Sequence, residues 1–172
     1  RHGRLGNQMF QYAGLRGIAA HKGYDFAIPP SDFNDEWNDH QLFEAFKLIG
    51  LTNIKEIPGP YVQEAHFHFD QNLFDNMPDG HNVYAYLQST KYFEHIEEEI
   101  REDFEFKNDI NLPCKEMMST LDKPIALHVR RGDYIQNSDN HPPCPKEYYD
   151  TALSKFDNNR TVVVFSDDPK WC

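Results

Sequence analysis

The chain has 172 residues, of which 28 are acidic and 17 are basic, so its formal net charge at pH 7 is −11. This balance argues against a nucleic-acid partner and against binding through anionic lipids, since both are usually held by a basic surface. Hydrophobic residues make up 39% of the chain, as expected for a globular core, and no apolar run reaches the roughly 18 residues that span a bilayer.

The first predicted element is a helix that follows a glycine-rich turn at residues 3–8. Its apolar residues recur with rough helical spacing: Met9, Phe10, Ala13, Ile18 and Ala19. Gly23 is expected to end the helix, and a short strand is predicted at residues 25–28. The order of turn, helix and strand lacks a first strand, so we expect a strand before Arg1 and a chain that is cut at this end.

The middle of the chain is predicted to be loop-rich at residues 31–60, with a short helix at residues 41–48. The sequence Val-Tyr-Ala-Tyr-Leu at residues 83–87 predicts a strand. Apolar residues then recur at steps of three and four through residues 93–104, which predicts an amphipathic helix. The acidic run inside that helix is interpreted as its solvated face.

Pro113 and the Asp-Lys-Pro sequence at residues 122–124 are interpreted as breaks after this helix. We therefore place a domain boundary between Asn111 and Lys123 and divide the chain into domains at residues 1–120 and 121–172.

The second predicted domain has a strand at residues 125–129, a helix around residues 149–156 and a fully buried strand at residues 161–165. This order predicts a right-handed parallel βαβ unit. One such unit cannot complete a sheet, so we expect this domain to be truncated. The three cysteines form no C-x-x-C pair, and we expect free thiols.

Polar residues follow both strands of the predicted βαβ unit, which places them at one edge of the sheet. They are His128, Arg130, Arg131, Asp167 and Asp168. Arginine side chains grip phosphate through paired hydrogen bonds, and a carboxylate can accept the two adjacent N–H groups of guanine. The pattern predicts a guanine-nucleotide site, with an Arg–Asp ion-pair network as the alternative interpretation.

Other patterns carry weaker hypotheses. Residues 131–133 form an Arg-Gly-Asp tripeptide, which we attribute to chance. On a strand, His66, His68 and Asp70 would share a face as metal ligands do, but surface histidines explain the alternation equally well. Residues 159–161 form an N-glycosylation sequon, and the aromatic residues, Trp171 among them, could stack on sugar rings.

Four segments together resemble glycosyltransferase family 11, the α-1,2-fucosyltransferases. They are GRLGNQMFQYA at residues 3–13, LQSTKYF at 87–93, HVRRGDY at 128–134 and FSDDPKWC at 165–172. The resemblance implies an α/β fold of the GT-B type, in which two Rossmann-like domains face a cleft. Residues 1–120 would form the acceptor-side domain, and residues 121–172 would begin an incomplete GDP-fucose-binding domain.

The resemblance also implies an inverting transfer of L-fucose from GDP-fucose to the 2-hydroxyl of a galactoside-terminated oligosaccharide, with no metal and no further cofactor. The family's roles map the donor diphosphate to Arg130 and guanine to His128 and Asp168. Arg131 and Asp167 are included on the donor side. A bacterial enzyme of this kind would be cytoplasmic or peripheral to the membrane, and a eukaryotic one would lie in the Golgi lumen.

Two roles are left open. Asp133 or Asp139 could accept the proton of the acceptor hydroxyl, but Asp133 could equally orient the arginines. Gly6, Asn7 and Gln8 could line the acceptor cleft at the start of the first helix.

Three rival functions remain beside the α-1,2-fucosyltransferase. They are another GDP-sugar transferase such as a protein O-fucosyltransferase, a non-catalytic glycan-binding module, and a structural domain whose arginines are matched internally. A later Ser/Trp-rich motif of the family has no counterpart, so we expect this chain alone to be inactive.

Overall fold

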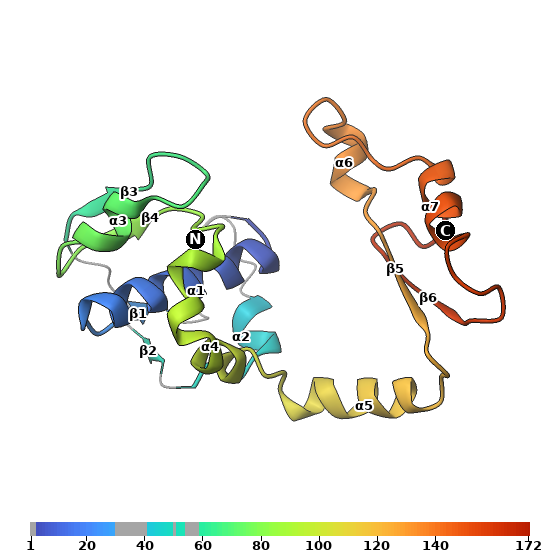
Figure 1. Ribbon diagram of the computed structural model, residues 1–172, viewed down its shortest axis with the longest axis horizontal. Coiled ribbons are helices and arrows are strands. Elements are labelled where there is room, and N and C mark those ends of the chain that lie inside the picture. Colours follow the sequence, from blue (N-terminus) through green and yellow to red (C-terminus); the bar gives the residue numbers. More distant parts are fainter. Residues whose placement is uncertain (1–2, 30–40, 50, 54–58) are drawn as a thin grey trace. The chain divides into compact units, whose positions relative to one another are not determined.

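The computed structural model describes residues 3–29, 41–49, 51–53 and 59–172. The chain divides into two compact units, Arg1–Asn111 and Leu112–Cys172, which we call unit 1 and unit 2 (Figure 1). The predicted α/β class is confirmed at a coarse level, because helices alternate with three two-stranded parallel sheets in the described part of the chain.

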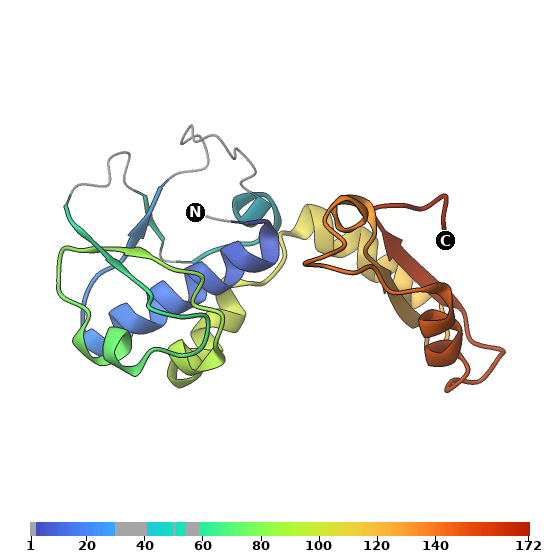
Figure 2. The ribbon, with the colours of Figure 1, turned by 90° about the horizontal axis from the view of Figure 1, so that it is seen from above.

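Unit 1 is organised around helix α1 (Leu5–Lys22), which runs through it (Figure 2). The helix was predicted, and so was its end: Gly23 adopts a left-handed conformation with φ of 69°, and its N–H caps the last turn. Gly3 also has a positive φ of 76° and packs so closely on Asn7 that a Cβ would overlap that side chain. Gly3 therefore allows the glycine-rich turn to pack against the first turn of α1.

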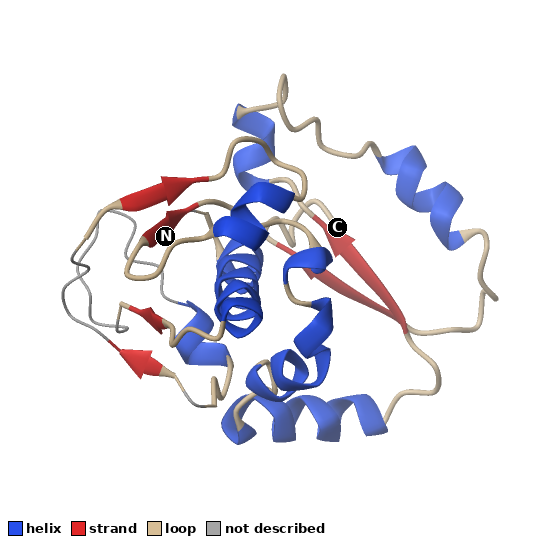
Figure 3. Cartoon of the chain, turned by 60° about the vertical axis from the view of Figure 1, so that its left-hand side comes forward, coloured by secondary structure: helices blue, strands red, loops and turns tan. Residues whose placement is uncertain are grey.

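Unit 1 also contains two small parallel sheets (Figure 3). Strand β1 (Ala27–Ile28) pairs with β2 (Thr52–Asn53), and β3 (Tyr61–Gln63) pairs with β4 (Asn82–Tyr84). The strand predicted at residues 83–87 is thus shorter than expected. Beyond Tyr84 the N–H groups of Tyr86 and Leu87 donate to the carboxylate of Glu64, and Leu87 turns the chain with φ of 52°.

The remaining elements of unit 1 are short helices. They are α2 (Gln41–Ala45), α3 (Gln71–Asn76), the 3-10 turns η1 (Thr90–Tyr92) and η2 (Glu94–Ile96), and α4 (Glu97–Asp103). The helix predicted at residues 93–104 is interrupted at Ile96, whose φ of −127° is not helical. The helix predicted at residues 41–48 ends at Ala45, because Phe46 forms a β-bridge with Phe106. Residues 31–40 and 54–58 of the predicted loop lie outside the described residues.

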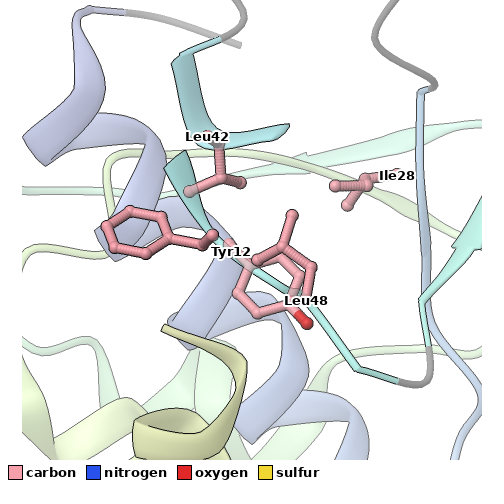
Figure 4. Packing of buried hydrophobic residues seen from close by; sticks show 5 residues of the cluster. Tyr12, Ile28, Leu42 and Leu48 are labelled. Atoms are coloured by element: carbon pink, nitrogen blue, oxygen red, sulfur yellow. The ribbon is translucent and has the colours of Figure 1, made fainter. Parts of the chain in front are cut away.

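The core of unit 1 consists of two clusters, and α1 contributes to both. In the first, side chains from α1, β1, α2 and residue 48 point toward one another (Figure 4). Its buried members are Tyr12, Ile28, Leu42, Phe46 and Leu48. The buried members of the second are Ile18, Leu73, Met77, Leu87 and Tyr92. Successive turns of the one helix therefore hold the two halves of the unit together.

Helix α5 (Asn108–Ser119) passes through the segment that was predicted to be a break, and Pro113 lies inside it. The prediction of a break at Pro113 is wrong. Proline removes one backbone donor, and the rest of the helix keeps its hydrogen bonds, beginning with those from Ile110 and Asn111 to the Lys107 carbonyl. No residue of α5 is buried, so packing does not explain why the helix persists.

Unit 2 contains the predicted strand–helix–strand arrangement. Strand β5 (Ile125–Val129) is followed by α6 (Gly132–Gln136) and α7 (Lys146–Leu153), and β6 (Val162–Ser166) then pairs with β5 in parallel. The predicted burial of the second strand is wrong: Val164 is 43% exposed and Phe165 is 52% exposed. In the described residues this sheet has two strands only, so neighbouring strands do not cover it.

Candidate functional site

The carboxyl ends of β5 and β6 lie side by side in unit 2. The strand register pairs Val129 with Ser166, so the arginines after β5 meet the aspartates after β6. The backbone N–H of Arg131 donates to Oδ1 of Asp167 at 2.8 Å across this edge. The structure therefore brings together Arg130, Arg131, Asp167 and Asp168, and we call these four residues the strand-end cluster.

Arg130 is held mainly by Asp133. Its Nε and Nη2 atoms donate to Oδ1 of Asp133 at 3.0 and 2.9 Å, and Nη2 also reaches Oδ2 at 2.9 Å. Oδ2 of Asp167 lies 3.3 Å from Nε, and the guanidinium stands over the Tyr134 ring at 5.0 Å. The Arg130 side chain is still 32% exposed, so an anion in solution can reach it.

Arg131 is more enclosed, with its side chain 19% exposed. Its Nε donates to Oδ2 of Asp168 at 3.2 Å, and its guanidinium lies 4.2 Å from the centre of the Trp171 ring. Trp171 in turn meets Tyr149 edge to face at 5.9 Å. Trp171 was a candidate for stacking on a sugar ring, and in the structure its ring packs on Arg131.

Asp167 is the acceptor at the centre of the cluster. Hydrogen bonds from the backbone N–H groups of Arg131 and Gly132 lower the pKa of its carboxyl, and the charge of Arg130 adds to this effect. A Cβ on Gly132 would lie 2.8 Å from Oδ2 of Asp167, so only glycine fits there without a shift. This role of Gly132 was not predicted, although a glycine directly after two arginines is a signal of close approach.

The other predicted residues of unit 2 lie around this cluster. His128 is exposed on β5 and pairs in register with Phe165. Asp139 is exposed in the turn after α6. Asp133 holds Arg130 through both oxygens, which is the orienting role considered as an alternative to proton acceptance. The ion-pair network weighed against a nucleotide site is thus present, and its members remain accessible.

The three cleft candidates lie in unit 1, on the first turn of α1. Oδ1 of Asn7 accepts a hydrogen bond from Nε2 of Gln88 at 2.7 Å, and Gln8 is buried with its Nε2 3.3 Å from the Gly3 carbonyl. Gly6 is exposed and has no atom within 4 Å of an added Cβ. A cavity of about 450 Å³ lies between α1, β1 and residues 77–87, and Gln8 is among its lining residues.

The residues considered for a metal have other contacts. The rings of His66 and His68 are stacked 3.5 Å apart, and Oδ1 of Asp70 caps α3 by accepting the Leu73 N–H. Among the described residues no group of three or more His, Cys, Asp or Glu side chains could hold a metal ion.

The cysteines are free thiols, as predicted: Cys114, Cys144 and Cys172. In the part of the chain that the structure describes, no helix is both long and apolar enough to cross a membrane.

Comparison with known proteins extends the interpretation of this site. The sequence model described as Glycosyl transferase family 11 matches residues 1–172. An α-1,2-colitosyltransferase of Escherichia coli is 26% identical over 99% of this chain and 68% of its own length. A galactoside 2-α-L-fucosyltransferase of Mus musculus is 26% identical, and a galactoside α-(1,2)-fucosyltransferase of Sus scrofa is 25% identical, each over 99% of this chain.

The chain spans only 49% and 53% of the lengths of those two mammalian relatives. No solved structure matches it.

Proposed function

The chain belongs to glycosyltransferase family 11, and from that premise we propose that it is part of an inverting galactoside α-1,2-fucosyltransferase. The donor is GDP-fucose, and the acceptor is the 2-hydroxyl of a galactoside at the end of an oligosaccharide. The observation that carries the proposal is the accessible pair Arg130 and Arg131 at the carboxyl end of β5, beside the end of the parallel strand β6, where α/β sheets bind ligands. The architecture we propose for the intact protein is GT-B.

Arg130 and Arg131 serve the diphosphate in this proposal. Each guanidinium presents a planar set of donors that suits phosphate oxygens, and both are oriented in advance by carboxylates and aromatic rings. His128 and Asp168 contact guanine, one from the end of β5 and the other from the segment after β6. No metal or cofactor takes part in the proposed reaction.

The proposed catalytic roles follow from the charge that develops on the donor during the transfer of fucose. As the bond between fucose C1 and the phosphate oxygen breaks, negative charge grows on the GDP leaving group and positive charge grows on the sugar ring. Arg130 faces the growing negative charge, so it stabilises the transition state more than the bound donor. Asp133 accepts the proton of the acceptor hydroxyl, with Asp139 as the alternative. Asp133 also pairs with Arg130, so the arginine must shift part of its bonding to phosphate first.

The first test is calorimetric titration with GDP in the absence of metal, with UDP as the matched control. It is made on this chain and on the longest natural form that contains it. We expect GDP to bind and UDP to bind at least ~10-fold more weakly, because only guanine offers the N–H pair that a carboxylate accepts. Equal binding of the two nucleotides, or binding of neither by the longer form, would overturn the proposal in favour of a glycan-binding or structural role.

The second test addresses Arg130 itself. Arg130→Lys keeps the charge and loses the planar set of donors, so turnover in the longer form should fall by ~100-fold or more, as for the loss of a preorganised donor. Near-normal turnover in the lysine variant would refute the role of Arg130.

One further candidate for the transferred sugar rests on a specific observation. One relative, matched over 68% of its own length, is a colitosyltransferase, and its name gives the same α-1,2 linkage. Assays that offer nucleotide-activated fucose and nucleotide-activated colitose in equal amounts would decide between the two sugars. We expect fucose to be transferred faster.

A further inference from the structure

Asp167 differs from the other two aspartates that contact these arginines in what it binds. Asp133 and Asp168 meet only arginine side chains in the contacts described above. Asp167 instead accepts the backbone N–H of Arg131 at 2.8 Å, and its Oδ2 lies 3.3 Å from Nε of Arg130 and 2.8 Å from the position of a Cβ on Gly132. One carboxylate on β6 therefore holds the backbone that carries both arginines.

We infer that Asp167 is a positioning residue, which fixes the turn of Arg130, Arg131 and Gly132 for the diphosphate and does not contact the nucleotide base. This inference rests on the proposed function and gives Asp167 a more specific role than the donor-side contact predicted from the sequence. It follows from the direction of the contacts, because both oxygens of Asp167 are directed at the turn.

The close fit at Gly132 supports the inference. An added Cβ would meet Oδ2 of Asp167 at 2.8 Å and its Cγ at 3.2 Å, so the turn and the carboxylate are matched in shape. Gly132 is also the first residue of α6, whose first N–H groups have no partner within the helix. A carboxylate from the neighbouring strand thus satisfies the start of α6 and sets the direction in which the two arginines leave β5.

The lowered pKa of Asp167 agrees with this arrangement. The two backbone N–H groups are its principal causes, and the charge of Arg130 is a smaller one. Asp167 therefore stays ionised at neutral pH, and its carboxylate continues to bind the turn there.

The experiment distinguishes a loss of binding to the diphosphate of the donor from a loss of binding to its base. Binding of GDP and of inorganic pyrophosphate is measured by calorimetry for the wild type, for Asp167→Asn and for Asp157→Asn, a matched change at an exposed aspartate in the loop before β6. If Asp167 positions the arginines, Asp167→Asn should weaken the binding of GDP and of pyrophosphate by the same factor. That factor should be about 10-fold, as for a lost hydrogen bond to a charged group. Asp157→Asn should change neither.

Amide hydrogen exchange on the same proteins gives a readout that needs no ligand. We expect the N–H groups of Arg131 and Gly132 to exchange at least ~10-fold faster in Asp167→Asn than in the wild type, with exchange elsewhere in β5 unchanged. Gly132→Ala provides a second variant, because its Cβ forces the carboxylate away while every charge remains. It should reproduce both the exchange result and the equal loss of GDP and pyrophosphate.

Two results would overturn the inference. A loss of GDP affinity with pyrophosphate binding unchanged would make Asp167 a base contact, and unchanged exchange at Arg131 and Gly132 would show that it does not hold the turn. The proposed function fails separately: if the wild type binds neither ligand while Asp167→Asn still accelerates exchange, Asp167 positions the turn but the turn does not serve a donor.

Discussion

The four segments that resemble the family form two spatial pairs, one in each unit, and the pairs are held by different forces. In unit 1 residues 3–13 meet residues 87–93 through a hydrogen bond from Gln88 to Asn7 at 2.7 Å and a ring contact between Phe10 and Phe93 at 6.2 Å. Farther along α1 the packing is close: a Cβ on Gly14 would lie 2.6 Å from Leu87, and one on Gly17 would overlap the Tyr92 carbonyl. In unit 2 residues 128–134 meet residues 165–172 through ion pairs and hydrogen bonds. The contacts of the first pair are mainly packing contacts, whereas the second pair exposes charged side chains to solvent.

Burial explains why the two pairs differ. The charged contact that links α1 to the end of α4 in unit 1 is shielded: Asp103 is fully buried, forms an ion pair with Arg16 and accepts a hydrogen bond from the Tyr12 hydroxyl at 2.7 Å. The charges of the strand-end cluster keep a fifth to a third of their side-chain surface in water. Buried charges are costly to disrupt, and exposed ones contribute little to stability, so only the second set is suited to exchanging partners with a ligand.

The largest effect is expected at Asp103. Asp103→Ala removes the partner of a mostly buried arginine, so the free energy of unfolding should fall by about 3 kcal/mol or more. Urea denaturation measures the loss, and Glu102→Ala at the neighbouring exposed position should stay within about 0.5 kcal/mol. A loss at Asp103 as small as that at Glu102 would break the comparison, because the unit 1 charges would then behave as surface charges.

The next effect tests the close packing of α1. Gly17→Ala should lower the free energy of unfolding by about 1–3 kcal/mol, since its methyl group overlaps the Tyr92 carbonyl. Gly6→Ala is the matched control on the same helix, where open space and better helix propensity predict a gain of about 0.5–1 kcal/mol. A loss of transfer in Gly6→Ala without a loss of stability would support the proposed acceptor role of Gly6.

A third effect appears only at high pH. Burial raises the pKa of Tyr12 to about 12, although the charge of Arg16 opposes the shift. The unfolded chain ionises this tyrosine near pH ~10, so its contribution to stability is complete below that pH and is lost as the pH rises toward 12. The wild type should therefore lose more stability between pH 9 and 11.5 than Tyr12→Phe does, as measured by urea denaturation at both pH values.

The smallest effect on stability is expected in unit 2. Asp168→Asn weakens a half-exposed ion pair with Arg131, so the free energy of unfolding should change by less than about 1 kcal/mol. GDP affinity should nevertheless fall, because Asp168 is a proposed guanine contact. If stability fell as far as in Asp103→Ala, the cluster would be structural, and the contrast between the units would disappear.

The sequence predicted the βαβ part of unit 2 closely, because strong strand formers and prolines mark its limits. Residues 125–129 are the observed β5, and the predicted second strand differs from β6 by one residue at each end. The meeting of Arg130 and Arg131 with Asp167 and Asp168 follows from parallel pairing alone. The exposure of Val164 did not follow, since burial depends on neighbouring strands and not on the strand's own composition.

Contacts between distant residues were beyond sequence reasoning. The acidic run of α4 was correctly interpreted as solvated, but Asp103 at its end is buried because Tyr12 and Arg16, some 90 positions away, supply its partners. The fit of Gly132 against Asp167 and the packing of Trp171 on Arg131 likewise depend on how two strand ends meet. Local pattern predicted which residues meet at the strand ends, whereas tertiary contacts decide which partner each of them binds.

The partly exposed arginines of this acidic chain also bear on how the proposed nucleotide donor approaches. The net charge of −11 repels an anionic nucleotide at a distance, whereas the arginines attract it at close range. Salt at ~0.1 M screens charges beyond about 10 Å, so it removes the distant repulsion before the near attraction. The association rate constant for GDP, measured by stopped flow, should therefore rise between ~10 and ~100 mM salt, the opposite of ordinary electrostatic steering.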